Sequence, residues 1–180
     1  MVEKRTRLSK EDRKQQITNA AKEVFIQKGY VSTTTASIAK QADIAEVTLF
    51  RYFSSKQEVF ESVIQPILEA PLQQIASLNS NFSKSERLFD LISRRVDFIK
   101  ENQGVIKLLL IEHERLDLKQ NYIQKMSETM KNQMLELEVS IDDSRMRLLI
   151  GMLLSFLYFP ARSKKEKDTF IQEIVDYLKQ

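Results

Sequence analysis

Cysteine is absent from this chain of 180 residues, and histidine occurs once, as His113. Disulfides, thiolate metal sites and cysteine nucleophiles are therefore excluded, and a histidine-rich metal site is impossible. Glycine and proline number only 3 each, far below their average usage. Because these two residues interrupt helices most strongly, their scarcity favours long helices.

Long apolar runs and a leader segment are also lacking. The first residues, MVEKRTRLSKEDRK, are charged and do not contain the apolar core of a secretory signal. The longest apolar run, residues 148–161, is short for a bilayer and contains Gly151 and Ser155. We therefore expect a cytoplasmic protein with no membrane partner.

The charge that is present is uneven. The chain is 42% hydrophobic and 29% charged, with a formal net charge of +3. Residues 1–60 carry 11 Lys and Arg against 7 Asp and Glu, while the remainder carries 17 against 18. A basic first third suggests contact with a polyanion, although four net charges could also arise by chance.

Helix signals run along the whole chain. Ser9 precedes an apolar stripe at helical spacing that ends at Gly29, and capping boxes begin at Ser55, Ser83 and Ser163. Pro66 predicts a kink or a break in the helix that it occupies. No segment alternates convincingly with the period of a strand. These patterns predict an all-α protein with about nine helices.

Residues 33–53 contain two short helices joined by a tight turn, which is the helix-turn-helix pattern. At 100° per residue, Leu49 and Phe53 share one face of the second helix. The opposite arc carries Val47, Thr48, Phe50 and Arg51. Such side chains can contact thymine methyls, sugars, guanine or phosphate in the major groove. An ordinary surface helix or a protein-contact face remains the alternative.

Several residues at fixed spacing in this region resemble the DNA-binding domain of the TetR family of transcriptional regulators. They are Gly29-Tyr30-x-x-Thr33-Thr34, Ile38-Ala39-x-x-Ala42 and Thr48-Leu49-Phe50-x-Tyr52-Phe53-x-x-Lys56. The match covers roughly residues 10–60. The later helices have no sequence signature, but their number and order fit the family's ligand-binding and dimerisation domain.

The resemblance implies two domains, residues 1–56 for DNA binding and residues 57–180 for effector binding and dimerisation. It also implies a role for each matched residue. Thr34 and Thr35 contact the DNA backbone or nearby bases, Glu46, Val47, Thr48 and Phe50 face the groove, and Tyr52 and Lys56 contact phosphates. The family's general activity is repression of transcription by a homodimer on a palindromic double-stranded DNA operator. A small-molecule effector, unknown here, releases it, and no cofactor or metal is implied.

Two features bear on sequence reading. Many family members have Ser-Lys-Gly where this chain has Ala45-Glu46-Val47, so the usual N-cap hydroxyl is missing. Glu46 could accept a hydrogen bond from cytosine or could only stabilise the start of its helix. Phe50 stands where the family often has Tyr, so a phenolic hydrogen bond is absent, and Arg51 is therefore the main candidate for polar base readout in this helix. The basic arm could add phosphate contacts or remain a solvated tail; its residues are Lys4, Arg5, Arg7 and Lys10.

The C-terminal third suggests a dimer. The run LLIGMLLSFLYF, residues 148–159, is apolar all round, so a helix there must be buried on more than one side. Gly151 and Ser155 would let two helices approach closely. The last helix adds an apolar face with Phe170, Ile174 and Leu178. A second copy of the chain is the simplest partner, and a monomer with one central helix is the alternative.

A ligand pocket is harder to find from the sequence. Met126, Met130 and Met134 form one stripe, which either lines a promiscuous site or belongs to the core. The same ambiguity applies to Phe98, Phe156 and Tyr158, and His113 lies among charged residues.

Recognisable enzyme motifs are absent. The chain has no paired carboxylates at a known spacing, no glycine-rich phosphate loop, no nucleophile motif and no metal cluster, so no catalytic residue is predicted. A helical interaction module without DNA binding is the other alternative to a regulator.

Overall fold

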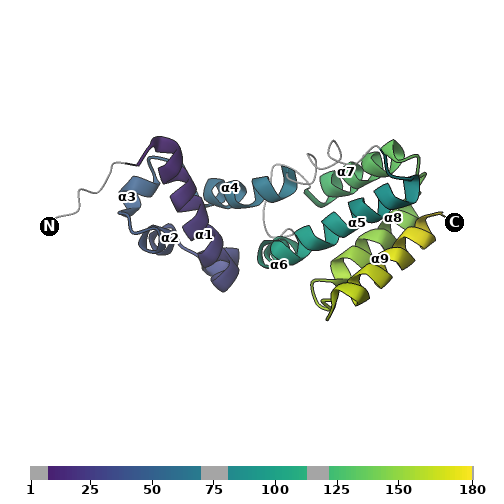
Figure 1. The fold of residues 1–180 in the computed structure, drawn as a ribbon. Helices are drawn as coiled ribbons and strands as arrows, with labels where there is room; N and C mark the ends of the chain where they lie inside the picture. The colour runs from purple at the N-terminus through teal and green to yellow at the C-terminus, as the bar shows by residue number, and fades with distance from the viewer. Residues whose placement is uncertain (1–7, 70–80, 113–121, 180) are drawn as a thin grey trace. The chain divides into compact units, whose positions relative to one another are not determined.

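The structure of the chain is a computed structural model that describes residues 8–69, 81–112 and 122–179. Within these residues the regular structure consists of nine α-helices and no strand, which confirms the all-α prediction (Figure 1). The chain forms two compact units, one from residues 1–67 with 108–115 and one from 68–107 with 116–180. The expected boundary after residue 56 separates a DNA-binding domain from an effector-binding domain, and this functional division stays a prediction. The first compact unit of the structure extends to residue 67.

The first unit begins with α1 (Lys10–Ser32), whose start is capped by Ser9. The Ser9 hydroxyl accepts a hydrogen bond from the Asp12 backbone N–H at 3.0 Å. Gly29 interrupts the helix with φ 73° and ψ 171°, a conformation that is essentially restricted to glycine. The regular part of α1 therefore ends at Gly29, as expected, and the short turn that follows leads to the next helix.

Three further helices complete this unit, α2 (Thr35–Gln41), α3 (Glu46–Leu49) and α4 (Lys56–Glu69). Their apolar residues pack on the buried stripe of α1, which includes Ile17 and Phe25. The α4 helix continues through Pro66, so the alternative of a break is wrong, and the alternative of a kink stays a prediction. Pro66 has no backbone N–H to donate to the carbonyl of Ser62, so the helix lacks one hydrogen bond at this position.

The second unit contains α5 (Lys84–Glu101), α7 (Tyr122–Glu136), α8 (Asp143–Ser155) and α9 (Lys164–Lys179). The α6 helix (Gln103–Glu112) contributes its first residues to this unit and its last residues to the first one. Within the second unit α5, α8 and α9 lie side by side, and α7 packs on α8 (Figure 1). Their core consists of leucine, isoleucine, valine and methionine side chains.

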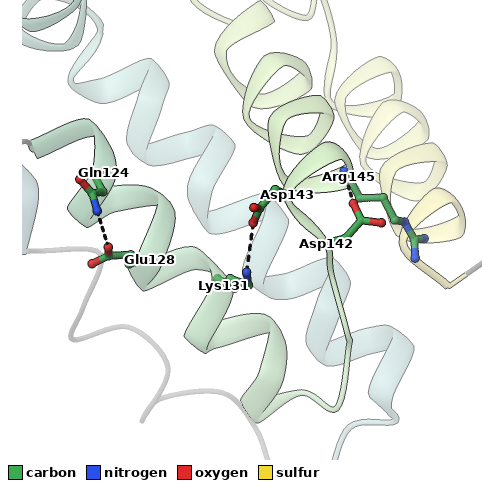
Figure 2. A network of polar contacts seen from close by, with 6 residues as sticks. All are labelled: Gln124, Glu128, Lys131, Asp142, Asp143 and Arg145. Atoms are coloured by element: carbon green, nitrogen blue, oxygen red, sulfur yellow. Dashed lines mark hydrogen bonds and ion pairs between the residues drawn. The ribbon is translucent and has the colours of Figure 1, made fainter.

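Polar contacts fix the start of α8 between its neighbours (Figure 2). The Asp142 carboxylate accepts the Arg145 backbone N–H at 2.8 Å and caps the helix. Lys131 on α7 forms an ion pair with Asp143 at 3.1 Å. The Arg145 guanidinium donates to the Tyr177 carbonyl on α9 at 2.6 Å. The three helices are thereby held in one arrangement around the core of the unit.

No helix in the described part of the chain is long and apolar enough to cross a membrane. Nor do the described Asp, Glu and His residues form any cluster of three that could hold a metal ion.

Candidate nucleic-acid interface

The α2 and α3 helices form a helix-turn-helix unit supported by α1. Thr34 caps α2, because its hydroxyl accepts the Ser37 N–H at 3.1 Å, while the Ser37 hydroxyl accepts the Thr34 N–H at 3.2 Å. Asp43 in the following turn has φ 51°, a left-handed conformation that Asp tolerates well. The Gln16 side chain donates to the Ala42 carbonyl at 2.7 Å and fixes this turn on α1.

The short helix α3 is anchored by one face and open on the other. Leu49 and Phe53 are fully buried, as their angular position predicts. Val47 is 64% exposed and Phe50 50% exposed, and the side chain of Arg51 is also exposed. This face lies open to solvent although two of its members are large and apolar. An open apolar face is compatible with a binding surface, and the DNA contacts of these residues stay a prediction.

Thr35 and Glu46 are joined by a hydrogen bond that was not anticipated from the sequence. The Thr35 hydroxyl donates to the Glu46 carboxylate at 2.6 Å and links the starts of α2 and α3. Glu46 also lies in the first turn of α3, where its charge favours the helix. Both residues therefore have a structural role, whether or not they also contact DNA. Thr48, on the same surface, is half-buried.

The Lys56 side chain turns inward in this structure. Its ammonium donates to the backbone carbonyls of Tyr30 and Thr33, each at 2.9 Å, and lies 4.3 Å from the centre of the Tyr30 ring. Burial, assisted by the charge of Glu61, raises the pKa of Tyr30, so this ring stays neutral. The implied phosphate contact of the Lys56 ammonium stays untested, and its observed role is to hold the turn after Gly29.

The structure describes only some of the remaining residues that were predicted to contact DNA. Tyr52 is half-buried beside α3, and Lys10 is exposed at the start of α1. The other arm residues, Lys4, Arg5 and Arg7, lie outside the described residues, as does His113.

The residues proposed for effector binding separate into two groups. Phe98, Met126 and Met130 line one cavity of about 60 Å³ in the second unit. Phe156 is buried against Phe170, with ring centres 5.3 Å apart, and lines a separate cavity of about 310 Å³. Tyr158 is exposed and lies under the Lys107 ammonium.

Arg95 is the buried residue that the sequence interpretation missed. It lines the cavity and is only 4% exposed. On α5 it lies one turn after Leu91 and Ile92 and one turn before Ile99, so it follows the spacing of the inward-facing residues. This spacing could have predicted the burial of Arg95 from the sequence, since it places a cation on the apolar side of the helix.

The residues predicted for the dimer interface differ in how exposed they are in the single chain. Gly151 is exposed and Ser155 half-buried, and a Cβ added at Gly151 would meet nothing within 4 Å. Ile174 and Leu178, however, are 1% and 3% exposed in the single chain. Both residues therefore belong to the core of the single chain, and their part in a dimer interface stays a prediction. Phe170 is half-buried against Phe156.

Comparison with known proteins agrees with this geometry. Residues 17–63 match the family model of "Bacterial regulatory proteins, tetR family". The nucleoid occlusion factor SlmA of Haemophilus influenzae is 34% identical over 109 residues, which are 60% of this chain and 49% of that protein. The transcriptional activator FasR of Mycolicibacterium smegmatis is 28% identical over 104 residues, covering 57% and 48% of the two chains. The chain thus spans about half the length of the curated relatives it matches.

A solved structure extends the similarity of fold to nearly the whole chain. Salmonella enterica GusR superposes with a TM-score of 0.76 over 95% of both chains, at 17% identity. The helix-turn-helix unit, the family model over residues 17–63 and the shared helical fold together support a TetR-family protein.

Proposed function

We propose that this protein is a transcriptional regulator that binds double-stranded DNA through α3. The observation that carries this proposal is the open face of α3, where Val47, Phe50 and Arg51 are exposed above the buried anchors Leu49 and Phe53. A helix of this size fits the major groove, and the N-terminal third is basic.

In this proposal the protein acts as a cytoplasmic homodimer on a palindromic operator. Two identical reading units related by a twofold axis match two half-sites in successive turns of DNA. Repression, with release by a small-molecule effector, is the part of the proposal taken from the family's general behaviour. The absence of recognisable catalytic motifs supports a binding role over an enzymatic one.

The test begins by selecting bound fragments from genomic DNA with the purified chain, followed by gel shifts on the enriched sequence and on random DNA. Specific binding should weaken with salt, by about 0.9 log units in affinity per log unit of salt for each phosphate contacted. Absence of any salt-sensitive DNA binding contradicts the proposal and favours a helical interaction module.

Arg51→Ala tests the reading face directly. If Arg51 contacts guanine, the variant should lose about 1–3 kcal/mol of affinity for the selected sequence and little for random DNA. Lys125→Ala, at an exposed lysine on α7, is the control and should leave both affinities unchanged. An equal loss on both DNAs makes Arg51 a phosphate contact instead.

A second candidate function follows from the similarity to SlmA, which is named as a nucleoid occlusion factor. The same selection of genomic fragments distinguishes this candidate function from transcriptional regulation. A transcriptional regulator should enrich one or a few sites next to promoters, whereas a nucleoid-associated role predicts sites scattered along the chromosome.

A further inference from the structure

A cavity of about 310 Å³ lies in the second unit, beside the turn that joins α8 to α9. Its walls come from α5, from this turn and from the first turn of α9, which packs beside α5 (Figure 1). The volume falls at the lower end of the range for small-molecule sites, roughly 300–1,000 Å³. Since a cavity of about 150 Å³ is enough for benzene, this one has room for a ring and a polar group.

One part of the cavity wall is apolar. Val96 and Phe156 are 2% and 9% exposed, and Pro160 and Ala161 of the turn add to this surface. The Phe156 ring packs edge-on against Phe170, with ring centres 5.3 Å apart, which fixes its orientation. The apolar group of a ligand would therefore meet a surface that is already formed before binding.

The charged residues that line the same cavity are mostly basic. They are Lys100 on α5, Arg162 in the turn, Lys164 and Lys167 on α9, and one carboxylate, Asp97 on α5. Lys167 and Asp97 form an ion pair, with distances of 2.8 and 3.0 Å from Nζ to the two carboxylate oxygens. Within the described part of the chain, the side chains of Lys100, Arg162 and Lys164 make no hydrogen bond or ion pair. The cavity therefore carries a positive charge that its own carboxylate does not balance.

The start of α9 adds to this charge. Ser163 caps the helix by accepting the Glu166 N–H at 3.1 Å, and the other N–H groups of the first turn have no partner within the helix. They give this end of α9 a partial positive charge, which the carboxylate of Glu166 partly offsets. Glu166 accepts the Arg162 backbone N–H at 2.7 Å and does not line the cavity. Side chains and backbone therefore favour an anion in the same place.

We propose that this cavity binds a phosphate monoester with a small apolar group. The phosphate lies among the side chains of Lys100, Arg162 and Lys164, and the apolar group lies against Val96 and Phe156. A phosphate monoester carries up to two negative charges at neutral pH, and a guanidinium can donate two parallel N–H bonds to its oxygens. The inference goes beyond the proposed function, because it concerns the second unit and requires no DNA binding.

The opposing interpretation is that these side chains are ordinary solvated cations around a hollow in the surface. In that case the apolar part of a ligand adds nothing to its affinity. Any lysine at the start of α9 would then attract an anion as well as Lys164 does. At about 0.15 M salt the attraction of distant charges is largely screened, so affinity measured there reports short-range contacts.

The experiment uses the full chain with ¹³C-labelled alanine methyl groups, titrated separately with phenyl phosphate, phenyl sulfate and inorganic phosphate. Phenyl sulfate has nearly the same shape with one negative charge less, and inorganic phosphate lacks the ring. The Ala161 methyl resonance should shift, because this residue lines the cavity. Phenyl phosphate should bind about tenfold more tightly than either control, since it combines the further charge-assisted hydrogen bond with the apolar contact. Equal affinity for either control, or no shift at Ala161, overturns the proposal.

Matched lysine variants assign the binding to the cavity. Lys164 and Lys165 are both exposed in the first turn of α9, but Lys165 does not line the cavity. Lys164→Gln should weaken the binding of phenyl phosphate by about three- to tenfold, as expected for a charge-assisted contact that is partly screened by solvent. Lys165→Gln removes the same net charge and should leave the affinity unchanged. Equal losses in the two variants overturn the proposal, because they show that the general charge of the surface attracts the ligand.

The alanine methyl groups also distinguish this cavity from the candidate DNA interface. Ala36 on α2 and Ala45 at the start of α3 are exposed in the first unit and report on phosphate binding there. Shifts confined to these two residues place the phosphate on the candidate DNA interface and overturn the proposal. Phosphate binding at Ala161 in a chain that binds no DNA supports the proposal and contradicts the proposed function alone.

Discussion

At the scale of single residues, the turn between α1 and α2 is held from three sides. Gly29 gives it a backbone conformation that other residues rarely adopt, and Lys56 on α4 donates to two of its carbonyls. The buried Glu112 carboxylate accepts the Tyr30 N–H at 3.2 Å. This turn positions the start of α2, so its supports also position the candidate reading surface.

Lys56→Met should destabilise the protein. The change removes two short hydrogen bonds to backbone carbonyls and the contact with the Tyr30 ring, for a loss of about 1–3 kcal/mol in the free energy of unfolding. Urea denaturation measures it, with the exposed Lys28→Met as the control. Full stability combined with weaker DNA binding would show that the ammonium serves as a phosphate contact.

Gly29→Ala should also lower the free energy of unfolding, by about 1–3 kcal/mol, because its φ of 73° is strained for any side chain. The new Cβ would lie 3.1 Å from the Glu112 carboxylate, which adds crowding. Thermal and urea denaturation measure the change, and Gln27→Ala, at an exposed position on the same helix, should stay near the wild type. A variant as stable as the wild type would show that the turn can relax.

At the scale of elements, α3 depends on its neighbours. It is one turn long, and Ala45 at its N-cap provides no side-chain hydrogen bond. An isolated helix of this length is not stable, so burial of Leu49 and Phe53 must hold it in place. The same burial sets which of its residues face outward.

Ala45→Ser should stabilise the protein by about 0.5–2 kcal/mol, because serine supplies the missing N-cap acceptor. Ala45 is exposed and has the extended backbone of an N-cap, so the hydroxyl can be accommodated. Ala36→Ser places the same hydroxyl inside α2 at another exposed position and should be neutral or slightly destabilising. Equal effects of the two changes in chemical denaturation would argue against capping.

The starts of the helices were predictable because capping is a local interaction. Ser9, Ser55 and Ser83 each accept an N–H from three residues later, as their sequence patterns predict. The path through Pro66 was not predictable, since proline lowers the stability of a helix locally while the packing of the flanking residues decides whether the helix persists. The Thr35–Glu46 hydrogen bond was also not predictable, because it joins two elements.

At the scale of the whole molecule, α8 carries an apolar face that the single chain leaves uncovered. Leu148 is 56% exposed and Gly151 is open, and the exposed Phe159 follows the helix. This face supports the proposed homodimer, because a second copy would remove it from water.

Leu148→Glu should shift the protein from dimer to monomer, because it places a charge within the apolar face. Leu135→Glu makes the same change on α7 at a leucine of similar exposure, 55%, and should leave the assembly unchanged. Sedimentation velocity over a concentration series measures the mass. A monomer for the wild-type chain would contradict the homodimer.

The sequence by itself determined the helical class, most helix starts, the helix-turn-helix spacing and the inward turn of Leu49 and Phe53. Each of these follows from short-range spacing, backbone capping and the 3.6-residue period. The tertiary structure alone decided that Lys56 holds a turn, that Ile174 and Leu178 lie in the core, and that Arg95 lines a cavity. These facts depend on which distant side chains meet across helices, and helical periodicity gives a residue's face but not its neighbour.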